Sequence, residues 1–187
     1  MYDDSFEIIE SDGLILTEMT ESAAREIASW QYGGEYSMYD LDGSEEEVSQ
    51  VMNGFHFPVY FSDGFDRNSK ACVSKPAGFV AIGPAAQVLS MTSRELYGES
   101  DATDIAIGLK PELCGLGEGL GLRLTGIAVN FALEEFPDDG VRLAVAEENG
   151  RAVKVYTKFG FKKTAEFAAF VKVNGKRKKK KFLLMEV

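Results

Sequence analysis

The sequence is poor in the residues that most often build covalent and metal sites. Its 187 residues include two cysteines, Cys72 and Cys114, and one histidine, His56. Two isolated thiols are too few for a disulfide framework, and their spacing matches no zinc-binding pattern. Nothing in the sequence brings the histidine to either thiol, as a cysteine nucleophile would require. We therefore expect no metal site, and we interpret the cysteines as small packing residues.

Long apolar runs are missing too, and positive charge is scarce. No apolar segment approaches the roughly 20 residues that a membrane-spanning helix needs, and MYDDSFEIIE at the amino terminus is acidic where a secretory signal would be basic. The formal net charge is −10, which disfavours nucleic acid because phosphate binding requires a basic surface. These features predict a cytoplasmic protein that binds neither membranes nor nucleic acids.

One basic run, Lys176–Lys181, departs from this acidic balance. It follows Asn174-Gly175, a pair typical of two-residue hairpin turns, and it leads into the apolar FLLM. We favour a solvated strand, whose lysines would discourage pairing with other chains at a sheet edge. An anion-binding patch or a nuclear-type signal is the alternative.

The apolar content of the sequence is sufficient for a sizeable core, because 45% of the residues are hydrophobic and 11% are aromatic. At this length we expect one domain spanning 1–187.

The segment 92–100 (TSRELYGES) is expected to be a loop. Turn residues and apolar spacing predict the following elements in the first half: strands on both sides of Asp12-Gly13, a helix in ESAAREIASW, a helix capped by Ser44 through about Met52, and strands in PVYFS and in ACVSKPAGFVAIG, the second broken by Pro76.

Strands and helices alternate in the second half. The sequence predicts a strand in TDIAIGLK ended by Pro111, a long helix from Leu120 that stops at Pro137, a strand in VRLAVA, a helix ending at Gly160, and a closing hairpin. Together with the first half, this order predicts an α+β fold with one mixed sheet.

The stretch CGLGEGLG, 114–121, places glycines directly before the long helix. It does not fit the dinucleotide fingerprint G-x-G-x-x-G, because the last glycine would fall on Leu120 or Leu122. It lacks the Lys-Ser or Lys-Thr pair of a Walker loop as well. Glycines at a helix amino terminus still allow backbone N–H groups to converge on an anion, which suits a pyrophosphate.

Gly108 interrupts the strand before this loop. Glycine in a strand marks a bulge or a close approach of another group. A ligand chain containing amides, such as pantetheine, would explain it by pairing with the strand at 107–109. An ordinary bulge is the alternative.

IGLKPELCGLGEGLG, followed by a helix and by LAVAEENGRAVKVYTKFGFKK, resembles the two central motifs of the GNAT N-acetyltransferase superfamily. The first is the acetyl-coenzyme A motif Q/R-x-x-G-x-G/A. The second is N-x-x-A-x-x-x-Y-x-x-x-G-F, which this chain matches at five positions: Asn149, Ala152, Tyr156, Gly160 and Phe161. The resemblance covers roughly half the chain, and it implies a three-layer fold whose mixed, mostly antiparallel central sheet has helices on both faces.

The resemblance also implies a reaction and a set of residues. Acetyl-coenzyme A would be the co-substrate, without a metal, and its acetyl group would pass to an amine that attacks the thioester directly. Tyr156 would protonate the departing thiolate. Cys114 stands where the family has Gln or Arg, so backbone amides would carry more of the pyrophosphate contact. The implied cofactor-binding residues are Ile107, Gly108, Leu109, Cys114, Gly115, Leu116, Gly117, Glu118, Gly119, Asn149, Ala152 and Tyr156.

The acceptor site is less well defined by the sequence. IASWQYGGEYSMYD stands where many members of the family have a segment bearing Trp and Tyr near the acceptor, so we expect a substrate-binding set of Trp30, Tyr32, Glu35, Tyr36 and Tyr39. A protonated amine must lose a proton before it attacks. Asp104 is the first candidate for this base and Glu35 the second.

Two functions remain open at this point. The first is an acetyltransferase that acts on a primary amine, either a small molecule or a protein N-terminus. The second is a non-catalytic acyl-coenzyme A sensor or interaction module. The sequence does not decide between a monomer and a homodimer.

Overall fold

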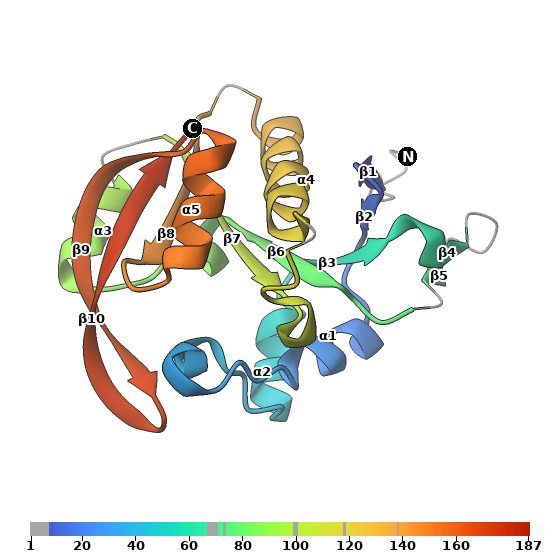
Figure 1. Ribbon diagram of the computed structural model, residues 1–187, viewed down its shortest axis with the longest axis horizontal. Coiled ribbons are helices and arrows are strands. Elements are labelled where there is room, and N and C mark those ends of the chain that lie inside the picture. Colours follow the sequence, from blue (N-terminus) through green and yellow to red (C-terminus); the bar gives the residue numbers. More distant parts are fainter. Residues whose placement is uncertain (1–7, 67–70, 73, 99–100, 118, 138) are drawn as a thin grey trace.

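The computed structural model describes residues 8–66, 71–72, 74–98, 101–117, 119–137 and 139–187 (Figure 1). The strands are β1 Ile9–Ser11, β2 Leu14–Leu16, β3 His56–Phe61, β4 Phe65–Asp66, β5 Ala71–Cys72, β6 Gly78–Ile82, β7 Thr103–Leu109, β8 Val141–Ala146, β9 Lys162–Val173 and β10 Lys176–Glu186. The α-helices are α1 Glu21–Ala28, α2 Glu45–Val51, α3 Met91–Gly98, α4 Leu120–Glu135 and α5 Gly150–Phe159, and the 3₁₀ helices are η1 Gly34–Tyr39, η2 Ser62–Gly64, η3 Gly83–Ala86 and η4 Pro111–Leu113.

Eight of these strands form one sheet in the order β1-β2-β3-β6-β7-β8-β10-β9. Neighbouring strands are antiparallel except β7 and β8, which run parallel. A parallel pair needs a crossover, and here it is α4, which connects β7 to β8. The prediction of a mixed, mostly antiparallel sheet is confirmed.

Two hairpin turns form where the sequence places them. Asp12-Gly13 has φ values of 48° and 72°, and Asn174-Gly175 has 51° and 72°. Both turn residues of each pair are therefore left-handed, which is the conformation of a two-residue turn that suits the strand twist. The first turn joins β1 to β2, and the second joins β9 to β10.

Side-chain caps fix the starts of three helices. Thr20 Oγ1 accepts from the backbone N–H of Ala23, and Ser44 Oγ accepts from that of Glu47, both at 3.2 Å. Asn149 Oδ1 accepts from Ala152 N at 3.3 Å. Each contact satisfies an amide that has no partner within its helix.

The expectation of a loop at 92–100 is wrong for most of that segment, because α3 extends through Gly98. Two serines start the helix by capping each other. Ser90 Oγ accepts from Ser93 N at 3.1 Å, and Ser93 Oγ accepts from Ser90 N at 2.7 Å. This is a capping box in which serine takes the place of the usual Glu or Gln. Residues 99 and 100 lie outside the described part of the chain.

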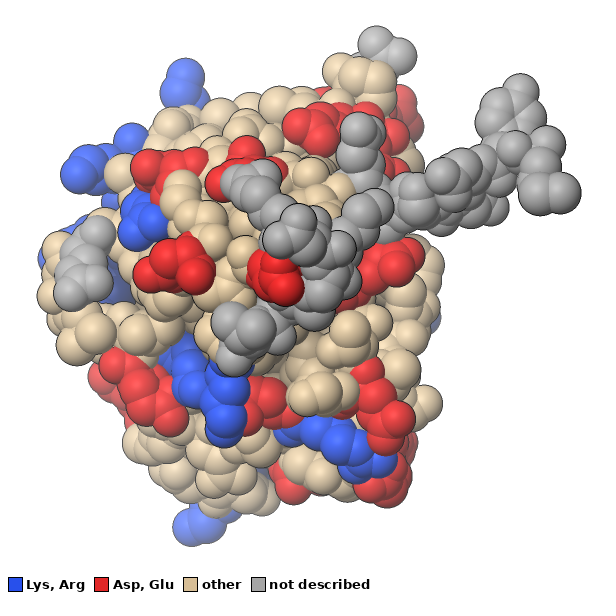
Figure 2. Space-filling view, turned by 90° about the vertical axis from the view of Figure 1, so that its right-hand side faces the viewer, with Lys and Arg blue, Asp and Glu red and all other residues tan. Residues whose placement is uncertain are grey.

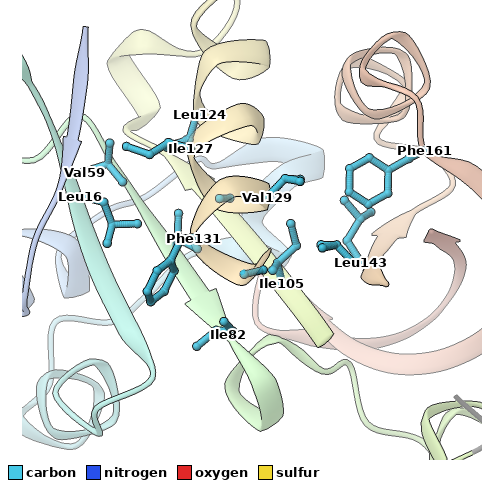
Figure 3. Close-up of a cluster of buried hydrophobic side chains, with 14 of the residues drawn as sticks. Leu16, Val59, Ile82, Ile105, Leu124, Ile127, Val129, Phe131, Leu143 and Phe161 are labelled. Atoms are coloured by element: carbon cyan, nitrogen blue, oxygen red, sulfur yellow. The ribbon is translucent and has the colours of Figure 1, made fainter. Parts of the chain in front are cut away.

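Helices cover both faces of the sheet (Figure 1), as the resemblance implies. On one face, α4 buries Leu124, Ile127 and Phe131 against the sheet together with α5 (Figure 3). Burying such side chains stabilises the fold by about 1.5–3 kcal/mol each. On the other face, α1 and α2 form a second cluster that Phe79 joins, and α3 packs on the β9–β10 hairpin with Tyr97 against Phe167.

The lysine run forms the first half of β10, and its side chains are mostly exposed, so the prediction of a solvated strand is confirmed. This half of β10 pairs only with β9, because the pairing with β8 begins at Phe182, so one edge of the lysine run is free of strand pairing, as expected. Two of the lysines form ion pairs: Lys180 with Glu148, and Lys181 with Glu147 at 3.1 Å and with Glu166 at 3.0 Å. On the face of the molecule that Figure 2 shows, acidic side chains lie among basic ones.

No helix in the described part of the chain is both long and apolar enough to cross a membrane. No group of three or more His, Cys, Asp or Glu side chains there is arranged to hold a metal ion.

Candidate functional site

The sheet opens between β7 and β8. Within the described ranges, the pairing of these strands covers only Thr103 with Val141 and Asp104 with Arg142. Beyond this point the strands spread apart (Figure 1). Residues 105–109 of β7 stay paired with β6 on the other side. The carboxyl half of β7 therefore has one edge free of strand pairing.

The register shows which backbone groups face this free edge. Lys110 N donates to Ala77 O at 2.9 Å, so Lys110 faces β6, and the alternation of an antiparallel ladder makes Gly108 face β6 as well. Ile107 and Leu109 then direct their backbone groups to the open side. An extended amide-containing ligand could add there as a further strand.

Part of this edge is already engaged. Tyr32 Oη donates to the carbonyl oxygen of Leu109 at 3.0 Å. The Cys114 thiol lies 3.6 Å from both Leu109 O and Lys110 O. The Leu109 carbonyl therefore has protein partners, and the backbone groups of Ile107 and the Leu109 N–H remain for a ligand.

The glycine stretch leads from η4 to α4 through three left-handed residues. Gly115, Gly117 and Gly119 have φ values of 83°, 78° and 69°. Residues with a Cβ rarely adopt such values. α4 begins at Leu120, directly after Gly119. The unpaired amides of the first helical turn and the helix dipole make this terminus favourable for an anion. Leu116 is exposed, and Glu118 lies outside the described residues.

On the other side of the opening, α5 begins at the end of β8. The Asn149 side-chain oxygen caps α5 by accepting a hydrogen bond from Ala152 N. Tyr156 packs against the main core and contacts Phe161 edge-on, with ring centroids 5.9 Å apart. Burial, and secondly the nearby Tyr39, raise the pKa of Tyr156. Its hydroxyl therefore stays protonated at neutral pH, as a proton donor must be.

The aromatic segment before and within η1 lies across the carboxyl ends of both strands. Tyr32 reaches Leu109 at the end of β7. Tyr39 contacts the Asn149 side chain and the Ala146 backbone at the end of β8. Burial raises the pKa of Tyr39, and these two contacts lower it. The two tyrosines meet edge-on with centroids 6.2 Å apart. This pair therefore connects the two strands where they no longer pair.

Other members of the expected acceptor set lie elsewhere. Trp30 is buried in the α1–α2 cluster, 6.1 Å from the Phe79 ring. Its Nε1 has no hydrogen-bond partner among the described residues. Glu35 is exposed on η1, and Tyr36 lies under the Arg151 guanidinium. Trp30 is therefore a core residue, whereas Tyr36 belongs to the segment around the opening.

Asp104 is poorly suited to the role of base that the sequence suggests for it. Its carboxylate is buried and receives hydrogen bonds from Arg142 Nε at 2.6 Å and Nη2 at 3.1 Å. Gln87 Nε2 donates a third, at 2.7 Å. The Arg142 guanidinium also contacts Leu96 O and Tyr97 O. A carboxylate with both oxygens engaged holds β7 and β8 together at the closed end of the opening.

Gly108 has an explanation that the sequence does not show. A Cβ at this position would lie 2.0 Å from Cε1 of Phe79, its partner on β6. The β6–β7 register runs without a shift, so the alternative explanation, a bulge, does not apply to this pair. The neighbouring aromatic ring is sufficient to account for the glycine.

The comparisons with known proteins agree with this architecture. No family model matches the chain, and no curated protein matches its sequence. Solved structures do match: an acetyltransferase of the GNAT family from Bacillus anthracis is 13% identical with a TM-score of 0.64, covering 97% of this chain and 98% of that one. A spermidine N-acetyltransferase mutant from Vibrio cholerae is 17% identical with a TM-score of 0.60, covering 95% and 94%.

A third match is the structure of yncA from Salmonella typhimurium with its cofactor acetyl-CoA, at 10% identity and a TM-score of 0.58, covering 94% of each chain. The molecule is thus an α+β protein whose sheet splits between two parallel strands. More specifically, it has the fold of the GNAT acetyltransferases, which confirms the fold that the sequence resemblance implies.

Three residues around the site are missing from the sequence-based set. Arg142 neutralises Asp104, Phe79 fills the space over Gly108, and Arg151 lies beside Gly115. The first two contacts depend on strand register, which no motif in the sequence encodes. Arg151 lies between the motif positions Asn149 and Ala152, and its charge beside an anion-binding loop was an available signal.

Proposed function

We propose that the chain transfers an acetyl group from acetyl-coenzyme A to a primary amine, on a small molecule or a protein N-terminus. The observation that carries this proposal is the unpaired edge of β7 at Ile107 and Leu109, which leads through η4 to a glycine loop at the start of α4. A pantetheine chain and a diphosphate are linked in the same order in coenzyme A. A strand edge and a helix amino terminus suit these two chemical groups.

The proposed reaction is a direct transfer. The amine nitrogen attacks the thioester carbonyl carbon, the carbon–sulfur bond breaks, and the sulfur receives a proton. Tyr156 is our candidate donor of that proton, because burial keeps its hydroxyl protonated and no described residue hydrogen-bonds to it. Donation to a developing thiolate lowers the barrier without requiring an ionised group at rest.

A base must accept a proton from the attacking amine. Asp104 does not suit this role, because Arg142 and Gln87 engage its carboxylate. Glu35 remains the candidate, since its exposed carboxylate lies on η1 beside Tyr36. The net charge of −10 favours a cationic acceptor that is deprotonated in the site.

Binding and turnover test this proposal separately. Calorimetry with coenzyme A and acetyl-coenzyme A should show one site per chain. A panel of polyamines, aminoglycosides, amino acids and peptides with free N-termini, assayed by release of free thiol, should contain at least one acceptor. No binding would refute the proposal, and binding without transfer to any amine would favour the non-catalytic sensor.

A further inference from the structure

Arg151 lies at the meeting point of three parts of the proposed site. It is the second residue of α5, two positions after the Asn149 cap. A Cβ built on Gly115 would lie 3.0 Å from its Nη1, so the guanidinium rests against the glycine loop. Its Cζ lies 4.7 Å from the centre of the Tyr36 ring on η1. One side chain thus contacts both the loop before α4 and the acceptor segment.

The hydrogen-bonding capacity of this guanidinium is unused within the described part of the chain. No hydrogen bond or ion pair joins Arg151 to a described residue, although the protein has 30 acidic side chains. By contrast, Arg142 binds a carboxylate through two nitrogens, and Arg25 binds two carboxylates through three. A fork of five N–H donors held over an aromatic ring can bind two oxygens of a phosphate.

Cys114 makes this arrangement significant. The GNAT motif that the loop resembles has Gln or Arg at this position, and a thiol supplies no charge. Burial raises the pKa of the Cys114 thiol, and the positive charge of Arg151 opposes this. The charge that the first motif lacks is therefore present beside the loop, supplied by another helix.

We propose that Arg151 is a diphosphate ligand of the acetyl donor, replacing from α5 the side chain that Cys114 does not provide, and that Tyr36 holds it in place. This inference rests on the proposed function. It adds a specificity-determining residue and a physical connection between the donor loop and the acceptor segment. The connection means that loss of the Tyr36 ring weakens donor binding through Arg151.

The first experiment compares donors that differ in their phosphates, using binding calorimetry. Arg151→Gln should lower the affinity for acetyl-coenzyme A by about tenfold or more, since a hydrogen bond to a charged group contributes about 1.5–3 kcal/mol. It should lower the affinity for 3′-dephospho-acetyl-coenzyme A by the same factor, because that donor keeps the diphosphate. The binding of S-acetylpantetheine, which has no phosphate, should not change.

Lys154→Gln is the matched control. Lys154 is exposed on the same helix, and its replacement removes the same charge. It should change the affinity for acetyl-coenzyme A less than twofold. Equal losses for Arg151→Gln and Lys154→Gln would mean that only the general charge of α5 matters, and the proposal would be wrong.

The second experiment tests whether an arginine at position 114, where the GNAT motif has Gln or Arg, can replace the charge of Arg151. Cys114→Arg in the Arg151→Gln background should recover most of the lost affinity. Tyr36→Leu alone should lower the affinity for acetyl-coenzyme A by about twofold to fivefold, because an exposed cation–π contact is lost. In the Arg151→Gln background it should have no further effect, because the two residues act as one unit.

The remaining outcomes each decide the question. If Arg151→Gln loses as much affinity for S-acetylpantetheine as for acetyl-coenzyme A, Arg151 is a structural residue and the proposal is overturned. If it loses affinity only for the donor with a 3′-phosphate, Arg151 binds that phosphate, and the diphosphate assignment is overturned. If the wild-type chain binds no acetyl-coenzyme A, the proposed function fails as well, whereas equal binding by wild type and Arg151→Gln refutes this inference alone.

Discussion

The hydroxyl of Tyr32 donates a hydrogen bond of 3.0 Å to the carbonyl oxygen of Leu109, the last residue of β7. The residues are 77 positions apart in the chain, and the bond joins the aromatic segment to the strand edge proposed for the donor. Asp40 holds this segment from within, since its Oδ1 accepts from the backbone N–H groups of Tyr32 and Gly33 at 2.6 and 3.0 Å. The two proposed substrates would therefore meet at a fixed junction.

Replacing the tyrosine should loosen this junction. Tyr32→Phe keeps the ring beside Tyr39 but removes the bond to Leu109, which contributes about 1 kcal/mol. We expect the KM for the amine acceptor to rise about fivefold with little change in kcat, because the acceptor segment is less well positioned. Steady-state kinetics measure this. Tyr97→Phe is the control, since it loses a contact with Val88 N away from the opening and should leave KM unchanged. An unaltered acceptor KM in Tyr32→Phe would contradict the prediction.

The Asp104–Arg142 pair should behave as a structural ion pair. Asp104→Asn leaves the buried Arg142 with only Glu186, 4.0 Å away, as a counter-charge, so the free energy of unfolding should fall by about 3–5 kcal/mol. Urea denaturation measures this loss. The exposed Asp101→Asn should change stability by less than about 0.5 kcal/mol. If Asp104→Asn kept wild-type stability but lost kcat by a hundredfold or more, Asp104 would be the base after all.

Gly108 should be sensitive to the smallest substitution. Gly108→Ala places a methyl group 2.0 Å from the present position of Phe79 Cε1, so the ring must move. We expect a loss of about 1–3 kcal/mol in unfolding free energy. In the Phe79→Ala background the same change should cost much less, as a double-mutant cycle would detect. Gly98→Ala, where no atom lies within 4 Å of the added Cβ, is the control. An equal cost in both backgrounds would mean that the ring is not the cause.

Local sequence signals predicted the parts of the fold that depend on neighbouring residues. The turns at Asp12-Gly13 and Asn174-Gly175 and the cap at Ser44 act over four residues or fewer, so the sequence itself contains their cause. The helix α3 was missed because its start depends on two serines that cap each other, and serine is also a common loop residue.

Residues far apart in the chain account for the errors at the site. Asp104 meets Arg142 only because β7 and β8 pair in parallel at that position, 38 residues apart. Phe79 reaches Gly108 through the register of β6 and β7. A motif names the residues of one segment but not those that the sheet places beside them. The Asp104–Arg142 ion pair and the Phe79 ring over Gly108 could therefore not be predicted from the motifs.

Substitution of Tyr156 tests whether this residue donates a proton to the thiolate or only packs in the core. Tyr156→Phe keeps the ring among its core neighbours but removes the proposed donor, so kcat should fall by about a hundredfold or more while binding of acetyl-coenzyme A stays unchanged. Tyr97→Phe removes a hydroxyl away from the opening and should retain activity. The pH profile is a second measurement. Since burial raises the pKa of Tyr156 above the ordinary value of 10.0, the protonated form persists through the alkaline range, and wild-type kcat should not decline from pH 7 to pH 10 through loss of this proton. A Tyr156→Phe enzyme with wild-type kcat would make Tyr156 a packing residue and would require another proton donor for the thiolate.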